Sequence, residues 1–297
     1  MQLISNHKWE KLGLLLKPNK DIWWCVSHTG SPYVKKDNNQ YILYFTGRDT
    51  GNKSRIGKCN LFLSDKPYIS DISLEPILDL GNEGTFSQDG TSYPCVIENN
   101  LYYTGWKRTY NVPFENNLGL AISLGQKYEN VTKAPLLPAT NQEPFGIGSV
   151  EVIKDESYLM WYTAFTKWEN GKHYYTIRHA KSKDGIKWKR IPGDCIKDIF
   201  NDEFAICRPS VIKSEGWYHM VFCSRGDKYK LGYAYSKDGI NWNRNDNILD
   251  ISNTPNSFDS EEMCYPHWFI EDDFVYLLYS GNDYGNEGIG IARLRLW

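Results

Sequence analysis

A short sequence pattern recurs along the chain about every 55–60 residues, and self-similarity at such a period indicates a repeat architecture. Each copy begins with a short run of β-forming residues, continues through a turn and ends in an aromatic-rich run. The first runs lie around Ser31, Tyr93, Gly148, Arg208 and Tyr265. Since every copy supplies several short strands, the pattern predicts an all-β fold, a five-bladed β-propeller in which residues 1–297 form a single domain.

Two copies share a nearly identical segment that predicts tight turns. Ser182–Trp188 reads Ser-Lys-Asp-Gly-Ile-Lys-Trp, and Ser236–Trp242 reads Ser-Lys-Asp-Gly-Ile-Asn-Trp. Asp-Gly between two alternating runs is a strong hairpin signal, because glycine adopts positive φ without steric cost. We therefore interpret Asp184 and Asp238 as turn residues and not as members of a site.

The two ends of the chain have complementary patterns. The run 8–16, which begins Lys-Trp-Glu-Lys, resembles the last strands of two repeats, 187–190 and 241–244. The fifth repeat stops at 289–294 and lacks such a strand. We predict that the N-terminal strand, with Trp9, pairs with the last blade and closes the ring. Closure would also remove an exposed strand edge, which otherwise invites aggregation.

Composition and charge argue against several classes of protein. The net charge is −2 and no basic stripe alternates with aromatic residues, so no nucleic-acid partner is expected. No run of about 20 apolar residues is present, so no membrane span is expected. The first eight residues lack the apolar segment of a secretory signal, and the seven cysteines form no Cys-x-x-Cys pair. We predict a cytoplasmic protein with reduced, mostly buried thiols, no metal site and no cofactor; the oligomeric state stays open.

Polar residues from all five repeats should meet at one place. In a propeller the innermost strands line a central channel, and their entry loops surround one mouth. The mixture expected there, of carboxylates, imidazoles, arginines and aromatic rings, is the one that glycosidic-bond chemistry needs. The predicted substrate-binding residues are His28, Arg48, Asp49, Tyr93, Trp106, Arg208, Tyr265 and His267.

Three carboxylates are the candidate catalytic residues. We expect Asp89 to be the base or nucleophile and Glu262 the acid, with Glu151 as the third candidate.

Each candidate also has a structural alternative. Asp89 precedes a glycine and suits a turn, Glu262 follows another glutamate and one of the two can simply be solvated, and Glu151 faces either the channel or a neighbouring blade. Arg208 can pair with a structural acid such as Glu203 instead of a ligand. Structural roles are also the commoner fate of the histidines and tyrosines.

The whole pattern resembles the five-bladed propeller glycoside hydrolases, the clan of arabinanases, β-xylosidases and invertases, together with the related mannoside phosphorylases. The resemblance covers nearly the whole chain. It rests on the Pro-marked inner strands, the two Ser-Lys-Asp-Gly-Ile-x-Trp segments, Arg208-Pro209-Ser210-Val211 and the ending Tyr279-Ser280-Gly281-Asn282. The sequence is also similar to glycosidase-like propellers encoded among surface-polysaccharide genes, and to a propeller domain attached to a plant sphingolipid glycosyltransferase.

This resemblance implies a glycosidase-like enzyme that acts on a glycosidic bond of a saccharide or a sugar-nucleotide-linked intermediate, in surface-polysaccharide metabolism. It also allows a calcium ion in the channel, although no ligand motif supports one. The hydrolases carry an Asp directly before the Pro-marked position of the first two repeats and a Glu near it in the third. Here those places hold Ser31, Tyr93 and the stretch 146–149.

The departure from the hydrolase pattern leaves three alternatives open. Displaced carboxylates can substitute for the missing ones, or hydrolysis can be replaced by transfer or phosphorolysis, with Arg208 and a histidine on the phosphate. The third alternative is a non-catalytic carbohydrate-binding or scaffolding propeller, with a generic protein-interaction propeller as a lesser option. A hydrolase should place two acids about 5–10 Å apart in the funnel, whereas a binding propeller should have aromatic rings and arginine without such a pair.

Overall fold

The computed structural model describes residue 4, residues 8–200 and residues 202–296. Within this part of the chain the regular structure is almost entirely β-strand, with one 3₁₀ turn, η1 (Asp246–Ile248), and one short helical segment, α1 (Asn282–Gly285). The fold is therefore all-β, as the repeat pattern predicts. The prediction that residues 1–8 form no secretory signal concerns residues that lie mostly outside the described part, and it stays a prediction.

The first two strand groups share one sheet. The first group contains β2 (Ser27–Asp37), β3 (Gln40–Arg48), β4 (Ser54–Phe62) and β5 (Tyr68–Ser70). The second contains β6 (Gly90–Ile97), β7 (Asn100–Arg108), β8 (Phe114–Ser123) and β9 (Tyr128–Asn130). Consecutive strands within each group pair antiparallel. One parallel residue pair, Ser54 with Gly90, connects the two groups, so the sheet divides into two four-stranded units.

Two further groups form separate four-stranded sheets. The third contains β10 (Ile147–Lys154), β11 (Tyr158–Glu169), β12 (Lys172–Ser182) and β13 (Trp188–Ile191). The fourth contains β14 (Ala205–Ser214), β15 (Trp217–Arg225), β16 (Tyr229–Ser236) and β17 (Asn243–Arg244). In both groups the strands pair in chain order, which is the arrangement that a meander with short turns produces.

The fifth group combines both ends of the chain. It contains β18 (Cys264–Glu271), β19 (Phe274–Ser280), β20 (Ile289–Arg295) and the N-terminal β1 (Glu10–Leu16). Strand β1 pairs antiparallel with β20, with Leu14 opposite Gly290. Trp9, just before β1, is buried in a cluster with Leu277 and Leu294 of the same group. The fourth strand of this sheet is thus supplied by the opposite end of the sequence.

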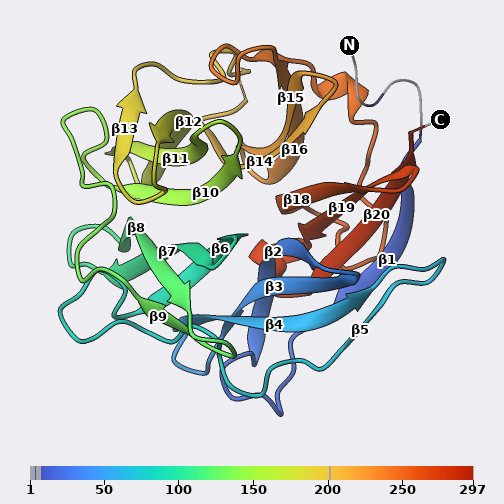
Figure 1. Ribbon diagram of the computed structural model, residues 1–297, viewed down its shortest axis with the longest axis horizontal. Coiled ribbons are helices and arrows are strands. Elements are labelled where there is room, and N and C mark those ends of the chain that lie inside the picture. Colours follow the sequence, from blue (N-terminus) through green and yellow to red (C-terminus); the bar gives the residue numbers. More distant parts are fainter. Residues whose placement is uncertain (1–3, 5–7, 201, 297) are drawn as a thin grey trace.

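The groups are arranged around a common centre, with the first strand of each nearest to it (Figure 1). Each inner strand contacts the next: β2 contacts β6, β6 contacts β10, β10 contacts β14, β14 contacts β18, and β18 contacts β2. Residues at corresponding positions of these strands therefore lie close together although they are far apart in the sequence.

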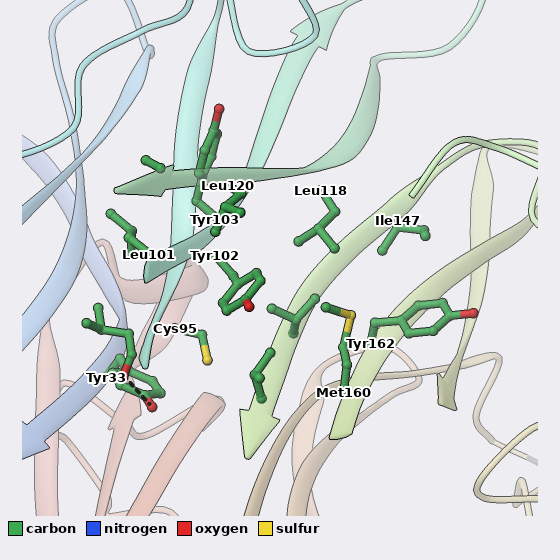
Figure 2. Close-up of a cluster of buried hydrophobic side chains, with 14 of the residues drawn as sticks. Tyr33, Cys95, Leu101, Tyr102, Tyr103, Leu118, Leu120, Ile147, Met160 and Tyr162 are labelled. Carbon is green, nitrogen blue, oxygen red and sulfur yellow. Dashed lines mark hydrogen bonds between the residues drawn. The ribbon is translucent and has the colours of Figure 1, made fainter. Parts of the chain in front are cut away.

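Buried side chains fill the space between neighbouring groups. In the cluster of Figure 2, Tyr33, Cys95, Tyr102 and Met160 come from three successive groups and pack together. Hydrogen bonds add to this packing, because the Tyr102 hydroxyl donates to the carbonyl of Gly185 in the next group at 2.7 Å. Apolar burial between the sheets is the main force that holds them in one body.

The repeated Asp-Gly segments form the predicted turns. Asp184 Oδ1 accepts the backbone N–H groups of Ile186 and Lys187 at 2.9 and 2.8 Å, and Asp238 makes the equivalent bonds in its own turn. Both following glycines have φ of 72°. The turn interpretation of Asp184 and Asp238 is therefore confirmed.

Two smaller predictions can also be compared with the structure. All seven cysteines are buried free thiols, in agreement with the sequence analysis. Among the described residues, no helix has the length and apolar character needed to cross a membrane.

Candidate functional site

The inner strands share one irregularity that brings particular side chains to the centre. The pairing with the second strand shifts register at the Pro-marked position of four groups. The residues before the prolines have φ of 52° or 53°, and they are Ser31, Tyr93, Arg208 and Tyr265. Residues other than glycine seldom adopt this left-handed conformation, and bulges re-aim side chains next to functional sites. The chain thus accepts backbone strain at four equivalent places around the centre.

A cavity of about 470 Å³ lies at this centre and is lined by all five groups. Ser31, Tyr93 and Tyr265 of the bulges contribute to its wall, but Arg208 does not. The charged or ionisable lining residues other than tyrosine and cysteine are three arginines and two histidines: Arg48, Arg108, Arg225, His28 and His173. Among the described residues, no Asp or Glu lines the cavity.

Two of these arginines are fixed by the same turn. Arg48 Nη1 donates to Asn52 Oδ1 at 3.0 Å, and Arg108 Nη2 donates to the carbonyl of Gly51 at 2.7 Å. The two guanidinium groups, from β3 and β7, therefore meet at adjacent residues. The Arg108 guanidinium also lies 5.9 Å from the ring centre of Trp106, another lining residue. This corner of the cavity combines positive charge with an aromatic face.

Asp49 and Asp89 lie behind this corner and do not line the cavity. Asp49 accepts the backbone N–H groups of Gly51 and Lys53 and pairs with Arg55 at 2.6 Å, so it shapes the turn that holds both arginines. Asp89 accepts the backbone N–H of Arg108 at 2.9 Å. Burial raises the pKa of Asp89, but hydrogen bonds from Arg108 and Gln88 outweigh it and the net pKa is lowered. Asp89 is therefore an ionised group that orients the backbone of an arginine.

A tyrosine cluster surrounds the third arginine. Arg225 donates to the hydroxyls of Tyr284 at 3.1 Å and Tyr229 at 3.5 Å, and its guanidinium lies 5.0 Å from the Tyr229 ring centre. The hydroxyls of Tyr175 and Tyr229 are hydrogen-bonded to each other. Burial raises the pKa of both phenols well above the usual range, so both are neutral.

Glu262 supports this tyrosine cluster from outside the cavity. Its Oε1 accepts the backbone N–H of Tyr284 at 2.9 Å, and its Oε2 accepts that of Tyr229 at 3.3 Å. The side chain is almost completely buried and does not line the cavity. Both carboxylate oxygens are therefore occupied by backbone groups of lining residues.

The two lining histidines are neutral. His173 is stacked between Phe165 and Trp168, with ring centres 4.3 and 4.0 Å away, and burial together with the charge of Arg225 lowers its pKa to about 3. Burial and then the charge of Arg48 lower the pKa of His28 to about 4, although the nearby Asp283 opposes this. His173 thus acts as part of an aromatic wall, while His28 offers a neutral imidazole.

Three predicted residues form a separate buried cluster. The fully buried Arg208 donates to the carbonyl of Pro32 at 2.9 Å and to that of Val150 at 3.5 Å. Glu151 Oε2 lies 4.0 Å from His267 Nδ1, and these two residues line a second hollow of about 440 Å³ with mostly apolar neighbours. We name Glu151, Arg208 and His267 the axial cluster.

The electrostatics of the axial cluster favour neutral forms of two groups. Burial raises the pKa of Glu151 to about 8, although Arg208 and Ser210 act in the opposite direction. Burial and Arg208 lower the pKa of His267 to about 3. At neutral pH, Glu151 is therefore mainly a protonated carboxyl and His267 a neutral imidazole.

The structure thus divides the predicted site residues into two sets. His28, Arg48, Tyr93, Trp106 and Tyr265 line the cavity. The others, Asp49, Asp89, Glu151, Arg208, Glu262 and His267, lie outside its lining. Glu203, the proposed structural partner of Arg208, pairs with Arg244 instead.

Sequence reasoning missed several lining residues, namely Asn52, His173, Tyr175, Arg225, Tyr229 and Tyr284. For Arg225 a signal existed. Arg48, Arg108 and Arg225 are the last residues of β3, β7 and β15, which are the second strands of their groups. The position at the end of the second strand therefore identifies a cavity arginine in three repeats.

The described residues contain no group of three His, Cys, Asp or Glu side chains that could hold a metal ion. The cavity lining consists instead of aromatic faces, hydroxyls, amides and guanidinium groups. Such a lining can bind a polar, ring-shaped molecule by stacking and hydrogen bonding.

Comparisons with known proteins identify relatives of this chain. No family model matches the chain. The Mycobacterium tuberculosis protein Rv1502, which is uncharacterised, is 36% identical over 297 residues, covering 96% of this chain and 99% of that protein. A 1,2-beta-oligomannan phosphorylase of Thermoanaerobacter is 30% identical over 98 residues, which cover 31% of this chain and 33% of that enzyme.

Among solved structures, a protein described as a glycoside hydrolase superposes with a TM-score of 0.76 at 19% identity, covering 98% of this chain and 92% of that chain. The fold is therefore a glycoside hydrolase-like β-propeller.

Proposed function

This chain belongs to the family of the Mycobacterium tuberculosis protein Rv1502, and from that premise we propose that it binds a saccharide in the cavity and acts on a glycosidic bond. The observation that carries the proposal is the lining of the cavity, in which aromatic faces stand beside fixed hydrogen-bonding groups. A volume of about 470 Å³ lies within the range of small-ligand sites. Aromatic rings suit the C–H faces of sugars, while the polar groups suit their hydroxyls.

We infer that the five strand groups are the blades of a single propeller that the N-terminal strand closes. The pairing of β1 with β20 supports this inference, as do the successive contacts from β2 through β18 and back to β2. A ring of five blades explains why one cavity draws its lining from every group.

The acceptor in the proposed reaction is a group other than water. Hydrolysis uses a carboxylate that activates water or attacks the anomeric carbon. No described Asp or Glu lines the cavity, and both oxygens of Glu262 are bound to backbone N–H groups, while Asp89 binds that of Arg108. We therefore assign Asp89 and Glu262 to positioning. The stretch of similarity to an oligomannan phosphorylase supports transfer to an acceptor, such as phosphate.

Glu151 remains a candidate for the general acid because its pKa is raised. Its pKa of about 8 leaves the carboxyl protonated at neutral pH, which is the form that donates a proton to a leaving oxygen. It faces the second hollow, however, so this role requires a saccharide that reaches past the bulges. The proposal places the substrate, a saccharide or sugar-nucleotide-linked intermediate, in cytoplasmic surface-polysaccharide metabolism.

A second candidate function is saccharide binding without catalysis. The lack of a lining carboxylate among the described residues favours it, because binding needs the aromatic and hydrogen-bonding groups alone. In that case the propeller presents or holds a saccharide for another protein.

One experiment separates these functions. The purified protein is incubated with a panel of oligosaccharides, with and without inorganic phosphate, and both free sugars and sugar phosphates are measured. We expect products only when an acceptor is present, and a Tyr265→Ala variant should lose binding and turnover together. Hydrolysis in phosphate-free buffer would contradict the transfer assignment, and binding without any product would favour the second candidate. If neither binding nor turnover is detected, the proposal that the cavity holds a saccharide is refuted.

A further inference from the structure

The ten arginines of the chain fall into two classes according to their partners. Six have a carboxylate oxygen within 4.0 Å, and they are Arg55, Arg178, Arg190, Arg244, Arg293 and Arg295. The other four, Arg48, Arg108, Arg208 and Arg225, form no ion pair with any described Asp or Glu. Three of these four line the cavity. Arginines without an acid partner are thus concentrated at one place.

The two arginines at the Gly51–Asn52 turn retain free donors. A guanidinium group has five N–H donors, and the structure gives Arg48 and Arg108 one side-chain hydrogen bond each. Arg48 is half-buried, so its positive charge is only partly solvated, whereas Arg108 is exposed. Two like charges held at adjacent residues repel each other, and an anion between them relieves that repulsion.

No described carboxylate forms an ion pair with Arg48 or Arg108, although the charge of Asp89 acts on Arg108. Asp49 pairs with Arg55, and Asp89 binds the backbone of Arg108 and lies 3.8 Å from Lys53 Nζ. The charges of Arg48 and Asp283 both act on His28, but Asp283 forms no ion pair with either arginine. Burial is the main cause that lowers the pKa of His28, and the charge of Arg48 lowers it further.

We propose that Arg48 and Arg108 form the binding site of an oxyanion, a phosphate or a carboxylate, with Arg225 as a further cationic contact in the same cavity. The guanidinium fork matches the oxygens of both groups and binds them through paired, charge-assisted hydrogen bonds. The inference rests on the proposed function, because the anion is either a substituent of the saccharide bound there or a free acceptor beside it. Trp106 lies next to Arg108 and offers its face to the attached ring.

Binding of matched ligands tests the proposal. Mannose 6-phosphate is compared with mannose, glucuronate with glucose, and inorganic phosphate is measured alone, all by calorimetry at 50 mM and 500 mM NaCl. We expect the charged member of at least one pair to bind about 10-fold or more tightly at low salt, with the advantage reduced at high salt. If phosphate alone binds as tightly as mannose 6-phosphate, the anion is a free acceptor; if only the sugar-linked anion binds, it is a substituent.

Variants connect the effect to the named residues. Arg48→Gln and Arg108→Gln should each reduce the charged-ligand advantage by about 10-fold, while Arg48→Lys should keep part of it. Arg295→Gln, which changes an exposed arginine outside the cavity, is the matched control and should change nothing. Circular dichroism verifies that every variant is folded.

Two results would overturn the inference. Equal affinity for charged and neutral members of both pairs, with neutral saccharides bound, would refute the anion site and leave the proposed function intact. Unchanged preference in both glutamine variants would place the anion elsewhere. Conversely, binding of phosphate but of no saccharide would support the anion site and contradict the saccharide-binding proposal.

Discussion

The ion-paired arginines outside the cavity and the arginines that line it belong to the same fold but differ in their partners. Arg244 lies almost fully buried between Glu203 and Asp246, with oxygens at 2.7 and 2.6 Å. Arg48, in the cavity, donates to an amide oxygen and pairs with no described carboxylate. A buried charge is costly unless it is paired, so the fold satisfies its structural arginines internally. Three of the four arginines without an acid partner line the cavity, and this concentration supports the proposed anion site there, while backbone carbonyls satisfy the fourth, Arg208.

Removing a paired arginine should have the largest effect on stability. Arg244→Met leaves the almost buried Glu203 without its partner, and we expect the free energy of unfolding to fall by about 3–5 kcal/mol. Urea denaturation measures this change. The double variant Arg244→Met/Glu203→Gln should recover part of the loss, because no charge is left unpaired. If the single variant loses less than about 1 kcal/mol, the claim that the fold depends on the ion pairs of its buried arginines is contradicted.

Arg208 is the fourth arginine without an ion pair, and a pH titration tests whether its neighbour Glu151 is neutral. Because burial raises the pKa of Glu151 from 4.5 to about 8, the folded state keeps a proton that the unfolded state loses, and stability falls as pH rises towards 8. The lowered pKa of His267 acts the other way, but only below its ordinary value of 6.5.

Between pH 6.5 and 8 we therefore expect the wild type to lose up to about 2 kcal/mol relative to Glu151→Gln, measured by urea denaturation at both pH values. Stability differences that stay constant over this interval would mean that Glu151 is already ionised and that Arg208 has a charged partner.

A variant of Asp89 tests whether this residue positions a lining residue or takes part in catalysis itself. Asp89→Asn keeps an oxygen that can accept the backbone N–H of Arg108, so we expect ligand affinity and turnover to fall by no more than about 10-fold. Calorimetry and steady-state kinetics on a substrate from the oligosaccharide panel measure both. A loss of about 1,000-fold in turnover with unchanged affinity would instead identify Asp89 as a catalytic base.

The smallest effect should come from a paired arginine at the surface. The side chains of Arg295 and Asp273 are 66% and 52% exposed, and their charged atoms are 4.0 Å apart. We expect Arg295→Gln to change stability by less than about 0.5 kcal/mol, because exposed ion pairs contribute little. Thermal unfolding measures the stability of this variant. A larger loss of stability would mean that the exposed ion pair stabilises the fold as the buried one does.

Much of the fold could be predicted from the sequence because its determinants are local. The Asp184 and Asp238 turns are encoded in seven consecutive residues, and the repeat spacing gave the all-β class. The pairing of β1 with β20 was also readable, since the missing strand at one end of the chain matched an extra strand at the other.

The site was harder to predict because its members are distinguished by direction and partner. Tyr93 and Arg208 occupy the same repeat position with nearly the same φ, yet one lines the cavity and the other points to backbone carbonyls. Asp89 and Glu262 are polar and central, but the backbone N–H groups of Arg108, at the end of β7, and of Tyr284, in α1, bind them. Such partners depend on how loops and strand ends fold together in three dimensions, which a repeat pattern does not encode.

A crystal structure of the protein soaked with mannose 6-phosphate tests the central claim most directly. We predict that phosphate oxygens lie within hydrogen-bonding distance of Arg48 and Arg108, with the sugar ring in the cavity beside Trp106. Ligand bound instead in the second hollow beside Glu151 and His267, with the cavity free of it, would contradict the account.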